Sequence, residues 1–297
     1  MRLGIDLGGT KVEIIAMGDD GEILTRRRIP TPKQDYQQAI QAIVELVKSV
    51  DAEMGTQGTL GIATPGAISP ATGLIKNANS TVLNGQPFDK DLARALGREI
   101  KIANDADCFT LSEAVDGAAQ GAASVFGVII GTGTGGGVVV NGRLLSGPNA
   151  IAGEWGHNPL PWPRPDELPG QRCYCGKDGC IETFLSGPGL AKQYLARYKE
   201  ALTSREIVER SQQGDEKAEQ SLALYEDRMA RALASIINVI DPYVIVLGGG
   251  LSNIDRLYDN VPALWGQYVF SDRVDTRLLK AKHGDSSGVR GAAWLWN

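Results

Sequence analysis

The sequence predicts an α/β fold made of two similar halves, and three observations lead to this prediction. The length of 297 residues is about twice that of a typical domain. Up to about residue 119, three consecutive strands are followed by strands that alternate with helices, which is typical of an α/β unit. A strand, a glycine-rich turn and a second strand occur at the N-terminus and again near residue 130, so a second unit of the same kind is expected.

The first half is expected to open with a β-hairpin over residues 3–7 and 12–16, followed by a third strand over 23–29. Apolar side chains at positions 40, 43, 44, 47 and 50 recur every three or four residues. This spacing predicts one amphipathic helix over 36–54, ended by Gly55. A strand over 59–63, a short helix over 89–96, a strand over 100–103 and an Ala-rich helix over 106–119 complete this half.

The second half is expected to begin near residue 122, with strands over 125–130 and 137–140 around a glycine turn. Residues 149–180 are rich in Pro, Gly and Trp, which predicts an irregular region held by something other than an apolar core. Helical patterns cover 189–240, and a strand over 244–247 runs into three glycines. Another helix and strand precede a last helix near 286–295. No short-period repeat is present, which excludes a solenoid.

The composition argues against two kinds of partner, nucleic acids and membranes. Thirty Lys and Arg against 35 Asp and Glu give a net charge of −5, which argues against a nucleic-acid partner. No apolar run approaches the roughly 18 residues of a membrane span, so no membrane partner is expected. No signal-peptide-like run precedes Asp6, and the cytoplasm is the expected location.

Five glycines lie within residues 131–137, in a segment that also matches the GxGxxG pattern of dinucleotide-binding folds. That pattern needs a helix after the glycines, whereas a Val-rich strand and an Asn-Gly turn follow here. A plain tight turn would need only one or two glycines. We therefore expect a hairpin that binds phosphate through backbone N–H groups and hydroxyls of Gly131, Thr132, Gly133 and Thr134.

A related turn follows the first strand. Asp6 stands near the end of that strand, where a carboxylate could hold Mg²⁺ through water, although such turns can also be purely structural. Combined with the second hairpin and a third glycine turn, it suggests a phosphate chain held at two turns and a nucleoside at the third. The residues of the first and third turns are Gly8, Gly9, Thr10 and Lys11, and Gly248, Gly249 and Gly250.

Asn104 and Asp105 directly follow a strand, at the end where α/β folds place ligands. A carboxylate there could act as a general base toward a bound ligand. The alternative is that Asp105 caps the helix that follows, and the residues alone leave both open.

Three of the four cysteines form a cluster. Cys173, Cys175 and Cys180, with His157 upstream, offer three thiolates and an imidazole, a set that suits tetrahedral Zn²⁺. Such a closed site is expected to be structural. Cys108 stands alone and is expected to be a buried, inert thiol, and His283 a structural residue with its hydrogen bonds satisfied.

These motifs together resemble the ROK sugar kinases of the actin-like and hexokinase-like ATPases. The resemblance implies a two-lobed, ribonuclease H-like α/β fold, ATP and sugar in the cleft between the lobes, a structural zinc ion and a homodimer. It places the first lobe at 1–117, completed by a helix over 285–297, and the larger lobe at 118–284. It implies Asp105 as the catalytic base. The residues it turns toward the sugar are Gly66, Asn79, Asn104, Asp105, Glu154, His157 and Glu182.

Two stretches, residues 79–88 and 155–162, look like the bacterial manno(fructo)kinase subgroup. We therefore expect a fructokinase that makes fructose 6-phosphate, with mannose second. An N-acetylhexosamine or glucose kinase is the alternative. A sugar-sensing ROK regulator is disfavoured because the first strand begins at Leu3, without room for a DNA-binding segment before it. The gap between His157 and Cys173 is longer than is usual in the family, which leaves the conformation of that loop open.

Overall fold

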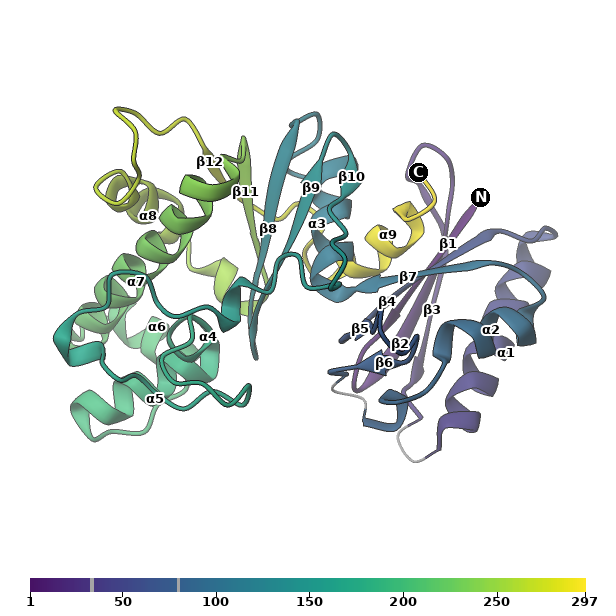
Figure 1. Cartoon of the computed structure of the whole chain (residues 1–297), viewed down its shortest axis with the longest axis horizontal. Coiled ribbons are helices and arrows are strands. Elements are labelled where there is room, and N and C mark those ends of the chain that lie inside the picture. The colour runs from purple at the N-terminus through teal and green to yellow at the C-terminus, as the bar shows by residue number, and fades with distance from the viewer. Residues whose placement is uncertain (33–34, 79–80) are drawn as a thin grey trace. The chain divides into compact units, whose positions relative to one another are not determined.

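The computed structural model describes residues 1–32, 35–78 and 81–297, and it has the α/β class that the sequence predicts. Two five-stranded sheets share one topology: counted along the chain, the strands of each lie in the order third, second, first, fourth, fifth (Figure 1). The first sheet contains β1 (Arg2–Leu7), β2 (Lys11–Met17), β3 (Ile23–Pro30), β4 (Thr59–Thr64) and β7 (Ile100–Asn104). The second contains β8 (Ser124–Ile130), β9 (Thr134–Val140), β10 (Arg143–Leu144), β11 (Val244–Gly248) and β12 (Arg277–Lys280).

Both sheets are mixed. In the first, β1, β2 and β3 pair antiparallel, whereas β1, β4 and β7 pair parallel. In the second, β9 and β10 pair antiparallel, whereas β8, β11 and β12 pair parallel. The strand and glycine-turn pattern that occurs twice in the sequence thus corresponds to a repeated sheet topology. A short hairpin of β5 (Ala67–Ile68) and β6 (Ile75–Lys76) was not expected.

The helices follow the expected pattern closely. The first half carries η1 (Thr81–Leu83), α1 (Tyr36–Met54), α2 (Phe88–Leu96), α3 (Asp105–Val115), η5 (Gly284–Ser286) and α9 (Ser287–Trp294). The second carries η2 (Trp155–His157), η3 (Pro165–Glu167), α4 (Glu182–Leu185), α5 (Gly187–Tyr198), α6 (Ser204–Gln212), α7 (Glu216–Ile240), η4 (Gly250–Asn253) and α8 (Leu257–Trp265). Gly55 ends α1 with φ 66°. Within the described ranges, none of these helices combines the length and apolar character that crossing a membrane requires.

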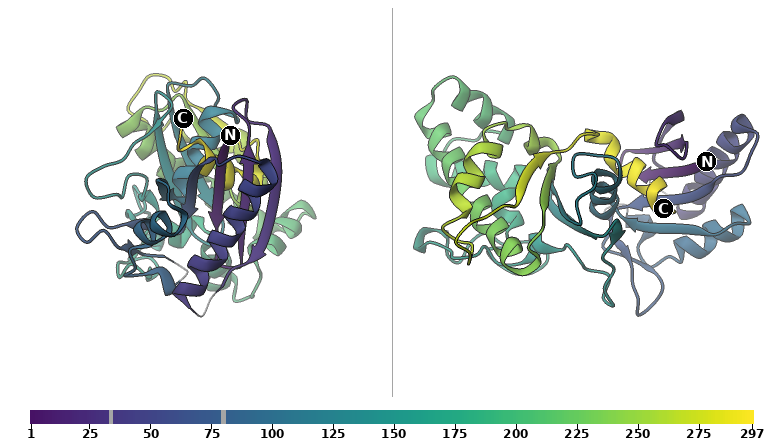
Figure 2. Two further views of the ribbon diagram at one scale, coloured as in Figure 1. Left: turned by 90° about the vertical axis from the view of Figure 1, so that its right-hand side faces the viewer. Right: turned by 90° about the horizontal axis from the view of Figure 1, so that it is seen from above.

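The two faces of the first sheet differ in what covers them. Leu3, Ile5 and Leu7 belong to the buried cluster that also includes the apolar side of α1. The opposite face carries paired glycines, and α9 packs directly on them: a Cβ at Gly4 would lie 2.1 Å from the Val289 carbonyl oxygen (Figures 1 and 2). Asp6 alternates with the apolar residues along β1, so its side chain projects to the α9 face.

One helix ends earlier than the sequence suggests. We expected the Ala-rich helix to reach residue 119, but α3 ends at Val115. The buried carboxylate of Glu113 accepts hydrogen bonds from the backbone N–H groups of Ala118, Lys282 and His283, at 2.8, 3.0 and 3.1 Å. These contacts turn the chain away from the helix axis and attach the C-terminal segment to α3.

Contacts divide the chain into two compact units. Unit 1 comprises residues 1–121, 137–152 and 282–297, and unit 2 comprises residues 122–136 and 153–281. The sequence-based division, by comparison, assigned 118–284 to the second lobe without interruption. Residues 137–152 group with unit 1 because the chain packs closely on α3 there: a Cβ at Gly137 would lie 2.8 Å from the Ala106 carbonyl oxygen.

Candidate functional site

Unit 1 contains two interacting carboxylates. Asp6 lies on β1, and Asp105 is the first residue of α3. Burial, followed by the negative charges of Asp105 and Glu13, raises the pKa of Asp6 to about 6, while Lys11 opposes the shift. Two acids that disfavour each other's ionisation form a site where a cation would be stabilised.

The helix cap belongs to Asn104 rather than to Asp105. The Asn104 Oδ1 accepts from the Ala106 N–H at 2.9 Å, and its Nδ2 donates to the Gly66 carbonyl at 3.2 Å. The side chain of Asp105 is exposed, although its Oδ1 also lies 2.8 Å from the Ala106 nitrogen. Gly66 has φ +85° and its Cβ would lie 2.3 Å from the Lys76 carbonyl oxygen, so only glycine fits there. Asn79 lies outside the described residues.

Loop one, residues 8–11, is a closed turn. The Gly8 N–H donates to the Lys11 carbonyl at 3.0 Å, and Thr31 Oγ1 donates to the Gly8 carbonyl at 2.6 Å. Gly9 and Thr10 are exposed at its tip, and a Cβ at Gly9 would meet nothing within 4 Å. Lys11 Nζ lies 3.5 Å from the carboxylate of Glu13.

Loop two, residues 131–134, connects β8 to β9 in unit 2. The Gly131 N–H donates to the Gly133 carbonyl at 3.0 Å, which closes the turn. The Thr134 N–H donates to Glu182 Oε2 at 2.9 Å, and the Thr134 side chain is buried. The backbone N–H groups of Gly131 and Thr134, which we expected to bind a phosphate, are therefore already used within the protein. The predicted phosphate-binding N–H groups of loop two are reduced to those of Thr132 and Gly133.

A cavity of about 800 Å³ in unit 2 joins loop two to the third glycine turn. Gly249 is required by the backbone, because its φ is +82° and a Cβ would lie 2.5 Å from the Ile130 carbonyl oxygen. Gly250 instead faces open space and lines the cavity. The lining residues come from loop two, α5, α6 and η4: Gly131, Thr132, Gly187, Pro188, Ala191, Thr203, Ser204, Arg205, Val208, Glu209, Gln212, Gly250, Leu251, Asn253 and Ile254.

The four predicted metal ligands lie together. The ligand atoms of His157, Cys173, Cys175 and Cys180 are all within 4.8 Å of one another. His157 Nδ1 is 3.6 Å from Cys173 Sγ, and the sulfurs of Cys175 and Cys180 are 3.6 Å apart. In tetrahedral zinc sites, ligand bonds of about 2.3 Å to sulfur and about 2.0 Å to nitrogen place neighbouring ligand atoms about 3.5–3.8 Å apart. The donor set and its spacing therefore fit a tetrahedral metal ion.

The remaining residues expected near the sugar have different surroundings. His157 Nε2, the nitrogen expected to face a sugar hydroxyl, lies 3.0 Å from the hydroxyl of Tyr174. Glu154 is exposed, whereas Glu182 is partly buried against loop two. The other predicted sugar ligands in the described ranges, Gly66, Asn104 and Asp105, belong to unit 1.

The long segment between His157 and Cys173 is attached to α7 by a buried ionic cluster. Glu167 is 4% exposed and accepts hydrogen bonds from Arg228 at 2.7 Å and from Arg231 at 2.8 and 2.9 Å. Arg231 also donates to the Trp162 carbonyl at 2.9 Å. Burial alone would raise the pKa of Glu167, but hydrogen bonds from Arg231, the Arg164 N–H and Arg228 outweigh it and lower the pKa to about 2.

Sequence patterns gave no signal for this cluster or for several cavity residues. Ser204, Asn253 and Ile254 reach the cavity from segments that are distant in sequence, and none belongs to a glycine-rich motif. Arg231 lies in the middle of α7, where a charged residue is normally expected on a solvated face. Two residues that were expected to be structural have surroundings that agree with this expectation. Cys108 is fully buried, which raises the pKa of its thiol. His283 Nε2 lies 3.0 Å from Asp116 Oδ1.

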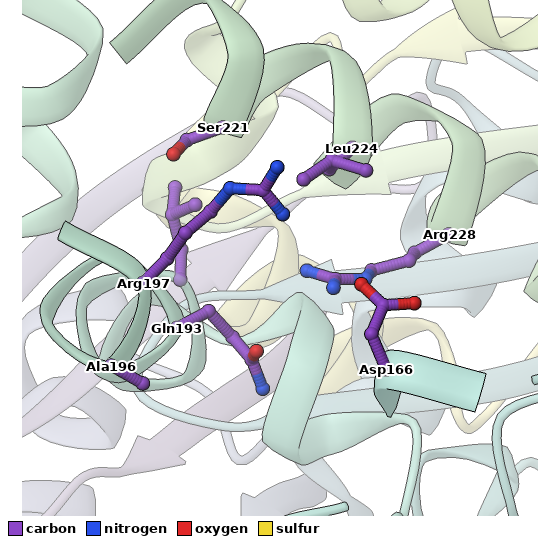
Figure 3. Close-up of a pocket in the computed structure, with 8 residues that line it drawn as sticks. Asp166, Gln193, Ala196, Arg197, Ser221, Leu224 and Arg228 are labelled. Carbon is purple, nitrogen blue, oxygen red and sulfur yellow. The ribbon is translucent and has the colours of Figure 1, made fainter. Parts of the chain in front are cut away.

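A separate cavity of about 280 Å³ lies between α5 and α7 in unit 2. Figure 3 shows the side chains of Arg197, Arg228 and Asp166 directed into it. No residue of loop one, loop two or the cysteine cluster lines it, so it is distinct from the candidate nucleotide site.

The family model, the sequence relatives and the solved structures that match this protein all cover nearly the whole chain. The ROK family matches residues 2–297. An N-acetyl-D-glucosamine kinase of Haemophilus influenzae is 41% identical over 304 residues, which cover 100% of this chain and 99% of that protein. The crystal structure of a ROK hexokinase from Thermus thermophilus has 32% identity and a TM-score of 0.88, covering 99% of this chain and 96% of that one.

A ROK family glucokinase from Streptomyces griseus, in complex with glucose and AMPPNP, has 26% identity and a TM-score of 0.76. It covers 99% of this chain and 98% of that one. The family match and the relatives above 30% identity extend over essentially every residue of the chain, the two glycine-rich loops and the cysteine cluster included. The chain therefore belongs to the ROK family.

Proposed function

We propose that this protein is an ATP-dependent sugar kinase whose preferred acceptor is N-acetyl-D-glucosamine. The observation that carries the choice of sugar is the similarity to N-acetyl-D-glucosamine kinases: eight such relatives are 38–42% identical over 99–100% of this chain. Kinase activity is supported by the residues themselves. Loop two and the Gly250 turn share one cavity, and the glucokinase with the same fold binds AMPPNP.

In this proposal, Asp105 acts as the general base. The oxygen of the sugar 6-hydroxyl attacks the γ-phosphorus of ATP, its proton passes to Asp105, and the bond from the γ-phosphorus to the bridging oxygen breaks to release ADP. Asn104 caps α3, and the Asp105 carboxylate lies exposed at the first residue of the helix.

Mg²⁺ is the expected partner of the nucleotide. Asp6 and Asp105 offer a pair of mutually repelling carboxylates, and this pairing fits a divalent cation. When bound, the ion would neutralise phosphate charge, with Asp6 holding it. From loop one, the exposed backbone of Gly9 and Thr10 and the ammonium of Lys11 would bind the phosphate chain, since the Gly8 N–H is used to close the turn.

The comparisons do not support the expected preference for fructose. That preference was expected from residues 79–88 and 155–162. In the described part of these stretches lie η1, the first residue of α2 and η2, which do not make up a complete sugar pocket. One or two hydroxyls or an acetamide distinguish the candidate sugars, and such differences depend on the shape of the whole pocket. Fructose, mannose and glucose therefore serve as competing substrates in the test.

A substrate panel tests the choice of sugar. ADP release is followed with N-acetylglucosamine, glucose, mannose and fructose, and kcat/KM is expected to be highest for N-acetylglucosamine. If kcat/KM is highest for fructose, the protein is instead a fructokinase of the manno(fructo)kinase subgroup. Absence of ADP release with every sugar would overturn the kinase proposal itself.

The nucleotide site has its own test. Gly250→Val places a branched side chain on the cavity lining, at a position where a Cβ meets no protein atom within 4 Å. KM for ATP should rise about tenfold, equivalent to about 1.4 kcal/mol, with little change in KM for sugar. Gly266→Val, at an exposed glycine that also meets nothing within 4 Å, is the matched control.

The cysteine cluster is proposed to hold one structural Zn²⁺. Its segment has little apolar core of its own, and metal binding would fix His157 between β9 and α4. Metal analysis should find one zinc per chain in the wild type and in Cys108→Ala, and much less in Cys175→Ser. Zinc-free wild-type protein with unchanged activity and thermal stability would refute the assignment.

A further inference from the structure

The segment that follows the last cysteine is attached to loop two at two points. The Gly187 N–H donates to the Gly131 carbonyl at 2.8 Å, and Glu182 Oε2 accepts from the Thr134 N–H at 2.9 Å. These contacts hold the first and last residues of the loop. Thr132 and Gly133, between them, are left to face a ligand.

The same segment is continuous with the cysteine cluster. Thr183 donates to the Cys180 carbonyl through both its N–H, at 2.9 Å, and its hydroxyl, at 2.7 Å. Glu182 is therefore the first residue of a short helix whose start is fixed by a proposed metal ligand. A carboxylate held in this way has little freedom to move independently of loop two.

The close approach of Glu182 also explains a glycine in the loop. A Cβ at Gly133 would lie 2.7 Å from Glu182 Oε2, so a side chain there would push the Glu182 carboxylate out of its present position. Glycine at this position thus serves the contact with Glu182 as well as the approach of a phosphate. The contact that the structure contains joins the Thr134 N–H of the expected phosphate loop to Glu182, which was expected to bind the sugar.

We propose that Glu182 is a positioning residue that couples sugar binding to the nucleotide loop. A carboxylate has two oxygens and can accept several hydrogen bonds, so Oε2 can keep the Thr134 N–H while the group also binds a sugar hydroxyl. Sugar then restricts the carboxylate, and the carboxylate restricts loop two. Since coupling between two ligands is reciprocal, nucleotide must raise sugar affinity by the same factor.

The inference rests on the proposed function for the identity of the second ligand, but its central measurement requires no turnover. The affinity of AMPPNP is measured by calorimetry with and without saturating N-acetylglucosamine. In the wild type, the sugar should tighten AMPPNP binding at least about fivefold, the lower end of typical coupling.

Three variants separate coupling from simple sugar contact. Glu182→Ala should weaken AMPPNP binding about tenfold without sugar, because the Thr134 N–H loses a charged acceptor, and the sugar effect should disappear. Glu182→Gln retains an acceptor oxygen and should keep the sugar-free affinity. Glu216→Ala removes an exposed carboxylate at the start of α7, which does not line the nucleotide cavity, and should leave the sugar-free affinity and the sugar effect at their wild-type values.

The outcomes separate this inference from the proposed function. Wild-type AMPPNP affinity in Glu182→Ala, with the sugar effect intact, would overturn the coupling. No sugar effect in the wild type, with a sugar that is turned over, would also overturn it. If no sugar is turned over, the kinase proposal fails, but the comparison of Glu182→Ala with Glu182→Gln in the absence of sugar still decides whether Glu182 supports loop two. Zinc content and melting temperature of each variant establish that it is folded.

Discussion

Asp6 in unit 1 and Glu167 in unit 2 are both largely removed from water, yet their surroundings shift their pKa values in opposite directions. Asp6 faces the acids Asp105 and Glu13, and its pKa rises to about 6. Glu167 is surrounded by guanidinium groups and a backbone N–H, and its pKa falls to about 2. Burial raises the pKa of both carboxyl groups, so the opposite net shifts arise from the charged and hydrogen-bonding groups around them.

This difference is the one expected between a carboxylate that binds a ligand, as we propose for Asp6, and a carboxylate that holds the fold. Glu167 uses both oxygens to attach a long loop to α7, and its ionised form stabilises the fold. Ionised Asp6 carries an electrostatic penalty that a bound cation would relieve. Carboxylates kept in such unfavourable surroundings are typical of active sites, whereas fully paired carboxylates are typical of structural networks.

The largest expected effect comes from removing the structural carboxylate. Glu167→Ala leaves the buried Arg231 without its main partner and should lower the free energy of unfolding by about 3–5 kcal/mol. Denaturant unfolding measures the change. Glu200→Ala, which breaks the more exposed pair with Arg210, is the matched control and should change stability by less than about 1 kcal/mol. If both variants lose the same free energy of unfolding, the buried Glu167 cluster stabilises the fold no more than an exposed ion pair does.

The second largest effect is expected when Asp105, the acid whose charge raises the pKa of Asp6, is neutralised. Asp105→Asn should lower kcat by at least about a hundredfold, about 2.7 kcal/mol, while sugar binding and folding persist. The same change removes a negative charge from the surroundings of Asp6, so the pKa of Asp6 should fall. Kinetic assays measure the first effect, and NMR titration of the Asp6 carboxyl measures the second. A kcat near the wild-type value would exclude Asp105 as the base.

The smallest effect is a gain in stability. Because the pKa of Asp6 is about 6 in the folded chain and near 3.8 when unfolded, ionised Asp6 destabilises the fold above pH 6. Asp6→Asn should therefore raise the metal-free unfolding free energy by about 1–2 kcal/mol at pH 7.5, even though activity is lost. The gain should shrink as the pH falls from 6 to 4 and vanish below, where Asp6 is protonated in both states.

Glu167 provides the opposite pH dependence in the same experiment. Its folded pKa of about 2 lies below the ordinary value of 4.5, so its stabilising effect is complete above pH 4.5 and is lost as the pH falls toward 2. A stability gain in Asp6→Asn that does not depend on pH would show that packing, rather than charge, causes it.

The order and type of the elements could be predicted from the sequence. The helix at Tyr36–Met54 and its end at Gly55 follow from apolar spacing and one glycine, because both signals are local to the chain. The repeated strand and glycine-turn pattern likewise predicted a second sheet of the same kind. The early end of α3 could not be predicted, because Glu113 binds backbone groups about 170 residues away along the chain.

In the candidate site, too, one part could be predicted from the sequence and another could not. Residue types alone determined that Cys173, Cys175, Cys180 and His157 form one cluster, since few other arrangements satisfy three thiols and an imidazole in one short region. Only the tertiary structure decided that Glu182 touches loop two and that Arg231 is buried on Glu167. Both are contacts between segments that are far apart in sequence, and a charged side chain has the same local signature whether it faces water or a buried partner.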